Sequence, residues 1–199
     1  MNDSHSFAID VLDLVCRRFE AKAADVSLLV ESDARLKPWL VGEAYLACKL
    51  QQSTNPFCEV MAEPPYGGTN GENVKDEDDN PLLKRGDLRV GATFEPGDHR
   101  WVFAEFAVLH PGIRDIEKWR KNVEKSAARL KRLRWVNSIA LLVIVVVNGP
   151  DRSGDLDGFD VWNRPALTKP FACPLPDGGS LVIKAFDIKQ RESDVKCLV

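Results

Sequence analysis

The feature that most constrains the fold of this sequence is the apolar, largely β-branched run within Val136–Val147. β-Branched residues favour strands, and a strand that is apolar on both of its alternating faces has to be covered on both. From Ile139 on, the run is about half of the roughly 20 residues that a membrane helix needs, so no membrane span is expected. The run therefore predicts a strand buried inside a sheet that is flanked by helices.

Patterns on either side of this run predict the other elements. Apolar residues three and four positions apart predict helices, which are Phe7–Ala24, Pro38–Gln52 and Ile113–Arg134. Period-two patterns and turn signals predict strands, which are Phe57–Ala62, Lys84–Thr93, Arg100–His110 and Ser180–Lys189. The stretch Val26–Val30 has no clear type. This order predicts an α/β fold whose mixed central sheet combines an antiparallel meander with the buried strand.

Length and composition predict one domain. Within residues 1–199 we expect an N-terminal helical segment (1–37), a core (38–148) and an irregular segment (151–179) before a last strand. Thr69–Pro81 is acidic and predicts a solvated loop. The net charge is −3, which argues against a nucleic-acid-binding protein with a basic overall composition, because sequence-independent binding to phosphates needs a positive surface. The five cysteines are scattered and odd in number, which predicts free thiols. The N-terminus has no basic segment followed by an apolar one, as a secretory signal would have, so a cytoplasmic location is expected.

Three carboxylates occupy positions that core packing does not explain. Asp87 lies in the second strand of the predicted meander, Glu105 lies in the third among apolar residues, and Glu43 lies on the helix before the sheet. A carboxylate inside an apolar strand is unfavourable unless it is paired or binds a cation. Two such groups on adjacent antiparallel strands can approach one hard divalent ion, which prefers oxygen ligands.

The order of these elements is a helix with Glu43, a strand, a strand with Gly86-Asp87, a strand with Glu105-Phe106-Ala107, a helix and a strand. This order resembles that of the PD-(D/E)xK nuclease superfamily. The resemblance covers roughly residues 38–148 and implies a restriction-endonuclease-like fold. It also implies that Asp87 and Glu105 hold Mg²⁺ (or Mn²⁺), that Glu43 holds a metal-bound water, and that the partner is nucleic acid, DNA in the first place. Many relatives of this type dimerise, so the resemblance allows a homodimer.

The sequence departs from this family at Ala107, which stands where the family has a lysine that positions the attacking water. Loss of such a group lowers the rate by about 10²–10⁴-fold. Strand and helix geometry places Arg120 or Arg89 as the replacement cation, able to hold a phosphate but not to act as a base. The alternative for Asp87 and Glu105 is a buried ion pair with one of these arginines.

The predicted helix Ile113–Arg134 carries nine basic and three acidic residues. Among the basic ones, Lys118, Lys121 and Lys125 are the candidates for contacts with nucleic acid, and a merely solvated helix face is the alternative. The sequence thus leaves two functions open. One is Mg²⁺-dependent hydrolysis of DNA, and the other is a binding or assembly subunit that keeps the nuclease fold without its catalysis.

Overall fold

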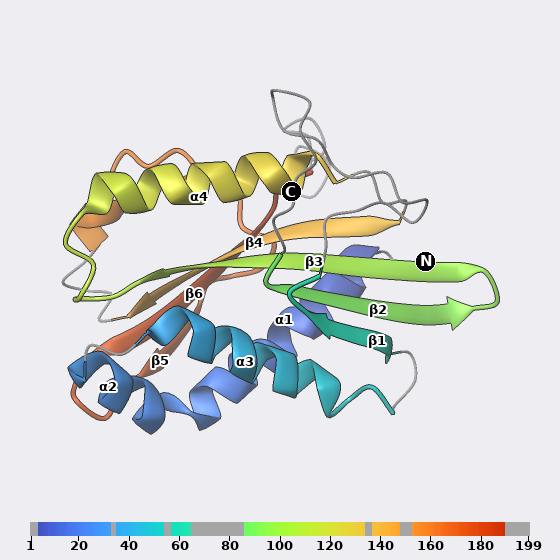
Figure 1. The fold of residues 1–199 in the computed structure, drawn as a ribbon, viewed down its shortest axis with the longest axis horizontal. Helices are drawn as coiled ribbons and strands as arrows, with labels where there is room; N and C mark the ends of the chain where they lie inside the picture. Colours follow the sequence, from blue (N-terminus) through green and yellow to red (C-terminus); the bar gives the residue numbers. More distant parts are fainter. Residues whose placement is uncertain are drawn as a thin grey trace.

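The computed structural model describes residues 4–32, 35–53, 57–64, 86–133, 137–147 and 153–189 (Figure 1). In these ranges the helices are α1 (Ser4–Ala21), α2 (Ala23–Glu31), α3 (Leu36–Lys49), α4 (Ile116–Lys131) and a 3₁₀ turn η1 (Ser153–Leu156). The strands are β1 (Phe57–Ala62), β2 (Leu88–Glu95), β3 (Asp98–Leu109), β4 (Ser138–Val147), β5 (Phe171–Pro174) and β6 (Ser180–Asp187). The predicted acidic loop Thr69–Pro81 lies outside the described residues.

The six strands form one mixed sheet in the order β1-β2-β3-β4-β6-β5. β1, β2 and β3 form the predicted antiparallel meander, and β4 joins β3 in parallel through α4. β6 then pairs antiparallel with β4, and β5 covers the edge of β6. The predicted α/β class with a mixed, helix-flanked sheet is therefore confirmed.

Helices cover both faces of the sheet, so the molecule has three layers (Figure 1). One core lies between the sheet and the layer of α1 and α3, and it takes alternate β3 residues such as Val102, Ala104 and Phe106. The second core lies under α4 and takes the residues in between, such as Phe103 and Ala107. Because period-two alternation sends neighbours to opposite faces, β3 and β4 must be apolar on both. This explains why the run before Val147 is buried throughout.

The N-terminal part differs from the predicted pattern. The predicted helix Phe7–Ala24 ends earlier, at Ala21, where Lys22 leaves helical geometry with φ −112° and ψ 16°. The untyped stretch Val26–Val30 belongs to the separate helix α2. Sequence periodicity missed this break because the apolar spacing continues across it without a glycine or proline.

Two further element boundaries differ from those predicted from the sequence. β2 begins at Leu88, and Gly86 and Asp87 precede it outside strand geometry. α4 begins at Ile116 instead of Ile113, because the side chain of Asp115 accepts a hydrogen bond from the backbone N–H of Lys118 at 2.9 Å and caps the helix there. In the expected irregular segment the structure contains η1 and β5. Within the described ranges, no helix is both long and apolar enough to cross a lipid bilayer.

Candidate functional site

Asp87 lies just before the start of β2, and Glu105 lies in β3 at the point where its pairing with β2 ends. In the β2–β3 register Leu88 faces Ala104, so Asp87 falls opposite Glu105, one position before β2 begins. From Glu105 to Leu109, β3 is paired with β4 on its other side. The register therefore brings the backbones of Asp87 and Glu105 opposite each other, and the directions of their side chains decide what they can bind.

Glu105 points to the layer of α4. Its side chain is 3% exposed, and Arg129 of α4 binds it with two hydrogen bonds, Nε to Oε1 at 3.2 Å and Nη2 to Oε2 at 2.5 Å. Arg129 Nη2 also donates to Ser126 Oγ at 2.8 Å. This fork-like contact engages both oxygens of the carboxylate.

Asp87 is bound from the other layer. Its Oδ2 accepts a hydrogen bond from the backbone N–H of Phe106 at 2.7 Å and lies 2.9 Å from Nζ of Lys37, in the first turn of α3. The Asp87 side chain is therefore fixed at the edge of β3 and neutralised from the α3 side, whereas Glu105 is neutralised from the α4 side.

The helix carboxylate Glu43 has its own partner. Its Oε2 accepts a hydrogen bond from Nε of Arg18 at 2.6 Å, which ties α3 to α1. Glu43, Asp87 and Glu105 thus form three separate ion pairs. In the described part of the chain there is no group of three or more His, Cys, Asp and Glu residues placed to hold a metal ion. In this structure each of the three carboxylates is therefore engaged by a basic side chain.

The two arginines predicted to replace the family lysine have other positions. Arg120 donates hydrogen bonds to the carbonyl oxygens of Asp155 (2.5 Å) and Asp157 (3.1 Å), so it anchors the segment around η1. Arg89 pairs with Glu59 of β1 and lies 5.3 Å from the ring centroid of Trp101. The alternative of an ion pair at Asp87 and Glu105 is therefore met by other cations than these two arginines, since Lys37 pairs with Asp87 and Arg129 pairs with Glu105.

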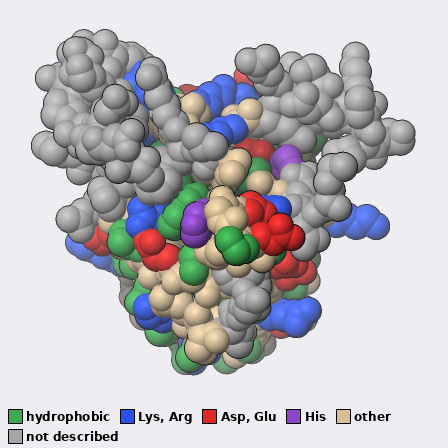
Figure 2. Space-filling view, turned by 90° about the vertical axis from the view of Figure 1, so that its right-hand side faces the viewer, with side chains coloured by type: hydrophobic (Ala, Val, Ile, Leu, Met, Phe, Trp, Pro, Cys, Tyr) green, Lys and Arg blue, Asp and Glu red, His purple; other side chains and the backbone are tan. Residues whose placement is uncertain are grey.

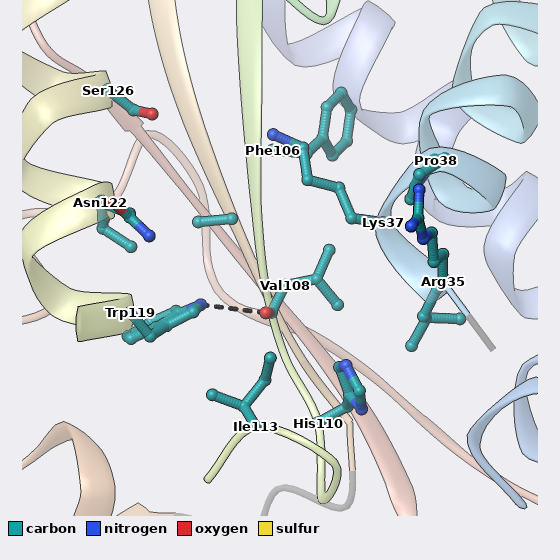
Figure 3. Close-up of a pocket in the computed structure, with 13 residues that line it drawn as sticks. Arg35, Lys37, Pro38, Phe106, Val108, His110, Ile113, Trp119, Asn122 and Ser126 are labelled. Atoms are coloured by element: carbon teal, nitrogen blue, oxygen red, sulfur yellow. Dashed lines mark hydrogen bonds between the residues drawn. The ribbon is translucent and has the colours of Figure 1, made fainter. Parts of the chain in front are cut away.

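A pocket of about 380 Å³ opens beside this part of β3 (Figure 3). The start of α3 forms one wall with Arg35, Lys37 and Pro38, and α4 forms the other with Trp119, Asn122 and Ser126. Leu36 of α3 and Val123 of α4 also line it, and β3 with the loop after it adds Phe106, Ala107, Val108, His110 and Ile113. Ala107 therefore lines a cavity.

The polar lining of this pocket is cationic or neutral. Among the described lining residues none is acidic, and the two basic ones are Arg35 and Lys37, of which Lys37 is paired with Asp87. Arg35 is exposed and makes no ion pair within the described ranges. α3 begins at this wall without a side-chain cap and without an acidic residue in its first turn, so its helix dipole adds positive potential.

His110 and Trp119 are held by internal hydrogen bonds. His110 Nδ1 accepts from the backbone N–H of Gly112 at 3.2 Å, which places the proton of a neutral imidazole on Nε2. Trp119 is buried, and its indole N–H donates to the carbonyl oxygen of Val108 at 2.9 Å (Figure 3). Trp119 therefore gives the pocket an apolar wall.

The three predicted nucleic-acid-binding lysines are exposed on α4. At 100° per residue, Lys118 and Lys125 lie about 40° and about 60° from the pocket residue Asn122, whereas Lys121 lies about 100° from it. Lys118 therefore flanks the pocket. At the end of the molecule where β2 and β3 turn, Figure 2 shows acidic and basic side chains interspersed over the described surface.

Sequence patterns missed Lys37, Arg129 and Arg35 as site residues. Each is a common surface-type residue on a helix, and only the packing of that helix against β3 gives it a role. The one available signal was Lys37-Pro38, since proline marks a helix start and the first helical turn attracts anions.

In comparisons with known proteins, no family model, no curated protein and no solved structure matches this chain.

Proposed function

We propose that the pocket between α3 and α4 binds phosphate groups of a nucleic acid, DNA in the first place. The chain would then be a binding module on a nuclease-like, restriction-endonuclease-type arrangement of strands and helices. The observation that carries the proposal is the lining of the pocket, where Arg35 stands at the uncapped start of α3, next to the ion pair of Lys37 with Asp87. Guanidinium groups bind phosphate oxygens with two parallel hydrogen bonds, and helix N-termini favour anions.

The size of the pocket indicates what part of a nucleic acid would enter. About 380 Å³ lies within the range of small-molecule sites and suits one nucleotide unit of a single strand or of a strand end, not a duplex. The apolar wall of Trp119, Ile113 and Val123 would face the base, and Asn122 offers hydrogen bonds. Lys118, on the flank of the pocket, would contact a neighbouring phosphate.

Fluorescence anisotropy with a labelled single-stranded DNA tests this proposal. Arg35→Ala should weaken binding about tenfold or more, because a hydrogen bond to a charged group contributes about 1.5–3 kcal/mol. Lys131→Ala is the matched control, since Lys131 is exposed on α4 about 140° away from Ser126. Binding should also weaken with rising salt. An Arg35→Ala protein that binds as tightly as the unchanged chain would rule out the pocket as the binding site.

A second candidate function is Mg²⁺-dependent hydrolysis of DNA, possible only if the ion pairs at the carboxylates open. The specific observation in its favour is that Asp87 lies opposite Glu105 in register and has the amine of Lys37 beside it, so a lysine stands near the carboxylate despite Ala107. The ion pairs of both carboxylates argue against a ready metal site, and for this reason binding comes first.

Supercoiled plasmid with Mg²⁺ or Mn²⁺ separates the two functions. Hydrolysis predicts nicking that Asp87→Ala and Glu105→Ala abolish and that Arg35→Ala only slows. Binding alone predicts no nicking with either ion and no calorimetric heat of Mn²⁺ binding, while the anisotropy signal persists.

A further inference from the structure

A serine and a lysine meet at the end of the sheet away from the pocket. Lys189 Nζ lies 2.6 Å from Ser138 Oγ, and both residues are half-buried. Ser138 is the first residue of β4 and pairs with Trp101, whereas the pocket lies beside the other end of β3. The two sites are therefore separate, and neither depends on the other.

The backbones that carry the two side chains are fixed. Ser138 follows Asn137, which has a left-handed φ of +52° and whose carbonyl oxygen accepts a hydrogen bond from the N–H of Trp101 at 3.0 Å. Lys189 follows Ile188, whose N–H donates to the carbonyl oxygen of Ala140 at 2.9 Å. A serine at the start of β4 is thus in contact with a lysine that lies two residues after the end of the neighbouring strand β6.

The surroundings of Lys189 combine burial with one carboxylate. Burial lowers the pKa of Lys189, and the negative charge of Asp187 partly opposes this shift. Asp187 in turn accepts a hydrogen bond from the backbone N–H of Lys189 at 3.0 Å, and its Oδ2 lies 3.2 Å from Nε2 of His5. A lysine amine that is partly desolvated and in contact with a serine hydroxyl is one of the known arrangements for nucleophilic catalysis.

We propose that Lys189 acts as the base that activates Ser138 Oγ as a nucleophile toward carboxylic esters. In this step the neutral amine of Lys189 takes the hydroxyl proton, and Oγ forms a bond to the acyl carbon. The bond from that carbon to the leaving oxygen breaks, and the leaving oxygen takes the proton from the Lys189 ammonium. The products are acyl-Ser138 and a free alcohol or phenol.

The probe is 4-nitrophenyl acetate added to the full chain, with release of 4-nitrophenol and the site of acetylation followed by mass spectrometry. We expect acetyl-Ser138, formed at least tenfold more slowly in Lys189→Met. Lys189→Arg is the second variant, because arginine keeps the charge and the hydrogen bond but cannot act as a base. Ser180→Ala is the matched control, since Ser180 also begins a strand and is half-buried, with no hydrogen bond to a lysine among the described residues.

The outcomes separate activation from mere contact. Acetylation at Ser138 that is lost in Lys189→Arg, with the circular dichroism spectrum unchanged, supports the proposal. Acetyl groups on surface lysines alone, or equal labelling of Ser138 in the unchanged chain and in Lys189→Arg, would overturn it. DNA binding by the pocket is expected to stay unchanged in all of these variants, so the two proposals stand or fall separately.

Discussion

Removal of Arg129 should destabilise the fold strongly. Glu105 has a side chain that is 3% exposed, and Arg129 donates two hydrogen bonds to its carboxylate. Arg129→Met removes this cation while it keeps most of the apolar stem. Breaking a buried ion pair by removal of one partner costs about 3–5 kcal/mol, because a buried charge loses its compensation. We therefore expect a loss of this size in the free energy of unfolding.

Urea and thermal unfolding, followed by circular dichroism, measure this loss. For a chain of 150–250 residues, 1 kcal/mol corresponds to about 2–4 °C in Tm, so the variant should melt about 6–20 °C lower. Lys131→Met on the same helix is exposed and should change stability by less than about 0.5 kcal/mol.

The double variant Glu105→Leu with Arg129→Met tests the cause. Replacement of a buried pair by apolar side chains is often neutral or stabilising, so the double variant should be more stable than Arg129→Met alone. A loss below about 1 kcal/mol in the single variant, or a double variant less stable than the single one, would refute the reasoning that an uncompensated charge causes the loss.

Two further predictions concern a close contact and the buried thiols. Gly91→Ala should destabilise the fold by about 1–3 kcal/mol in urea unfolding, because its Cβ would lie 2.5 Å from the ring of Trp101, whereas Gly42→Ala, with nothing within 4 Å, should not. Burial raises the pKa values of Cys16 and Cys48 from 9.0 to about 12. Between pH 9 and 12 the unfolded chain therefore binds fewer protons than the folded one, and stability should fall as the pH rises. The slope should be shallower in the Cys16→Ala/Cys48→Ala variant, and an equal slope would contradict this assignment.

Local patterns predicted the parts of the fold that depend on burial alone. The strand within Val136–Val147 could be predicted because a strand covered on both faces admits few polar residues. The β2–β3 turn could be predicted from Pro96-Gly97, and Gly97 indeed has a φ of +89°. The four-residue strand β5 was missed, because its pairing with β6 depends on a neighbour that local pattern does not identify.

The partners of the acids could not be predicted, because they depend on where helices begin and how they pack. Glu105 lies about 16 Å from His110 along β3, which corresponds to about eleven residues of a returning helix. Counted from Ile113, that distance ends at about residues 120–124, where Arg120 is the basic residue on the inward-facing stripe. Counted from Ile116, where α4 begins, it ends near residue 127, within one turn of Arg129. A shift of three residues in the start of the helix therefore changes which arginine is predicted to pair with Glu105.

The small side chain at position 107 has a consequence for how this scaffold could change. Ala107 faces the hollow between the two helical layers, and a lysine in its place would extend into the room that a ligand would occupy. A single substitution at this position would therefore reduce the room in the cavity and add a positive charge to its wall.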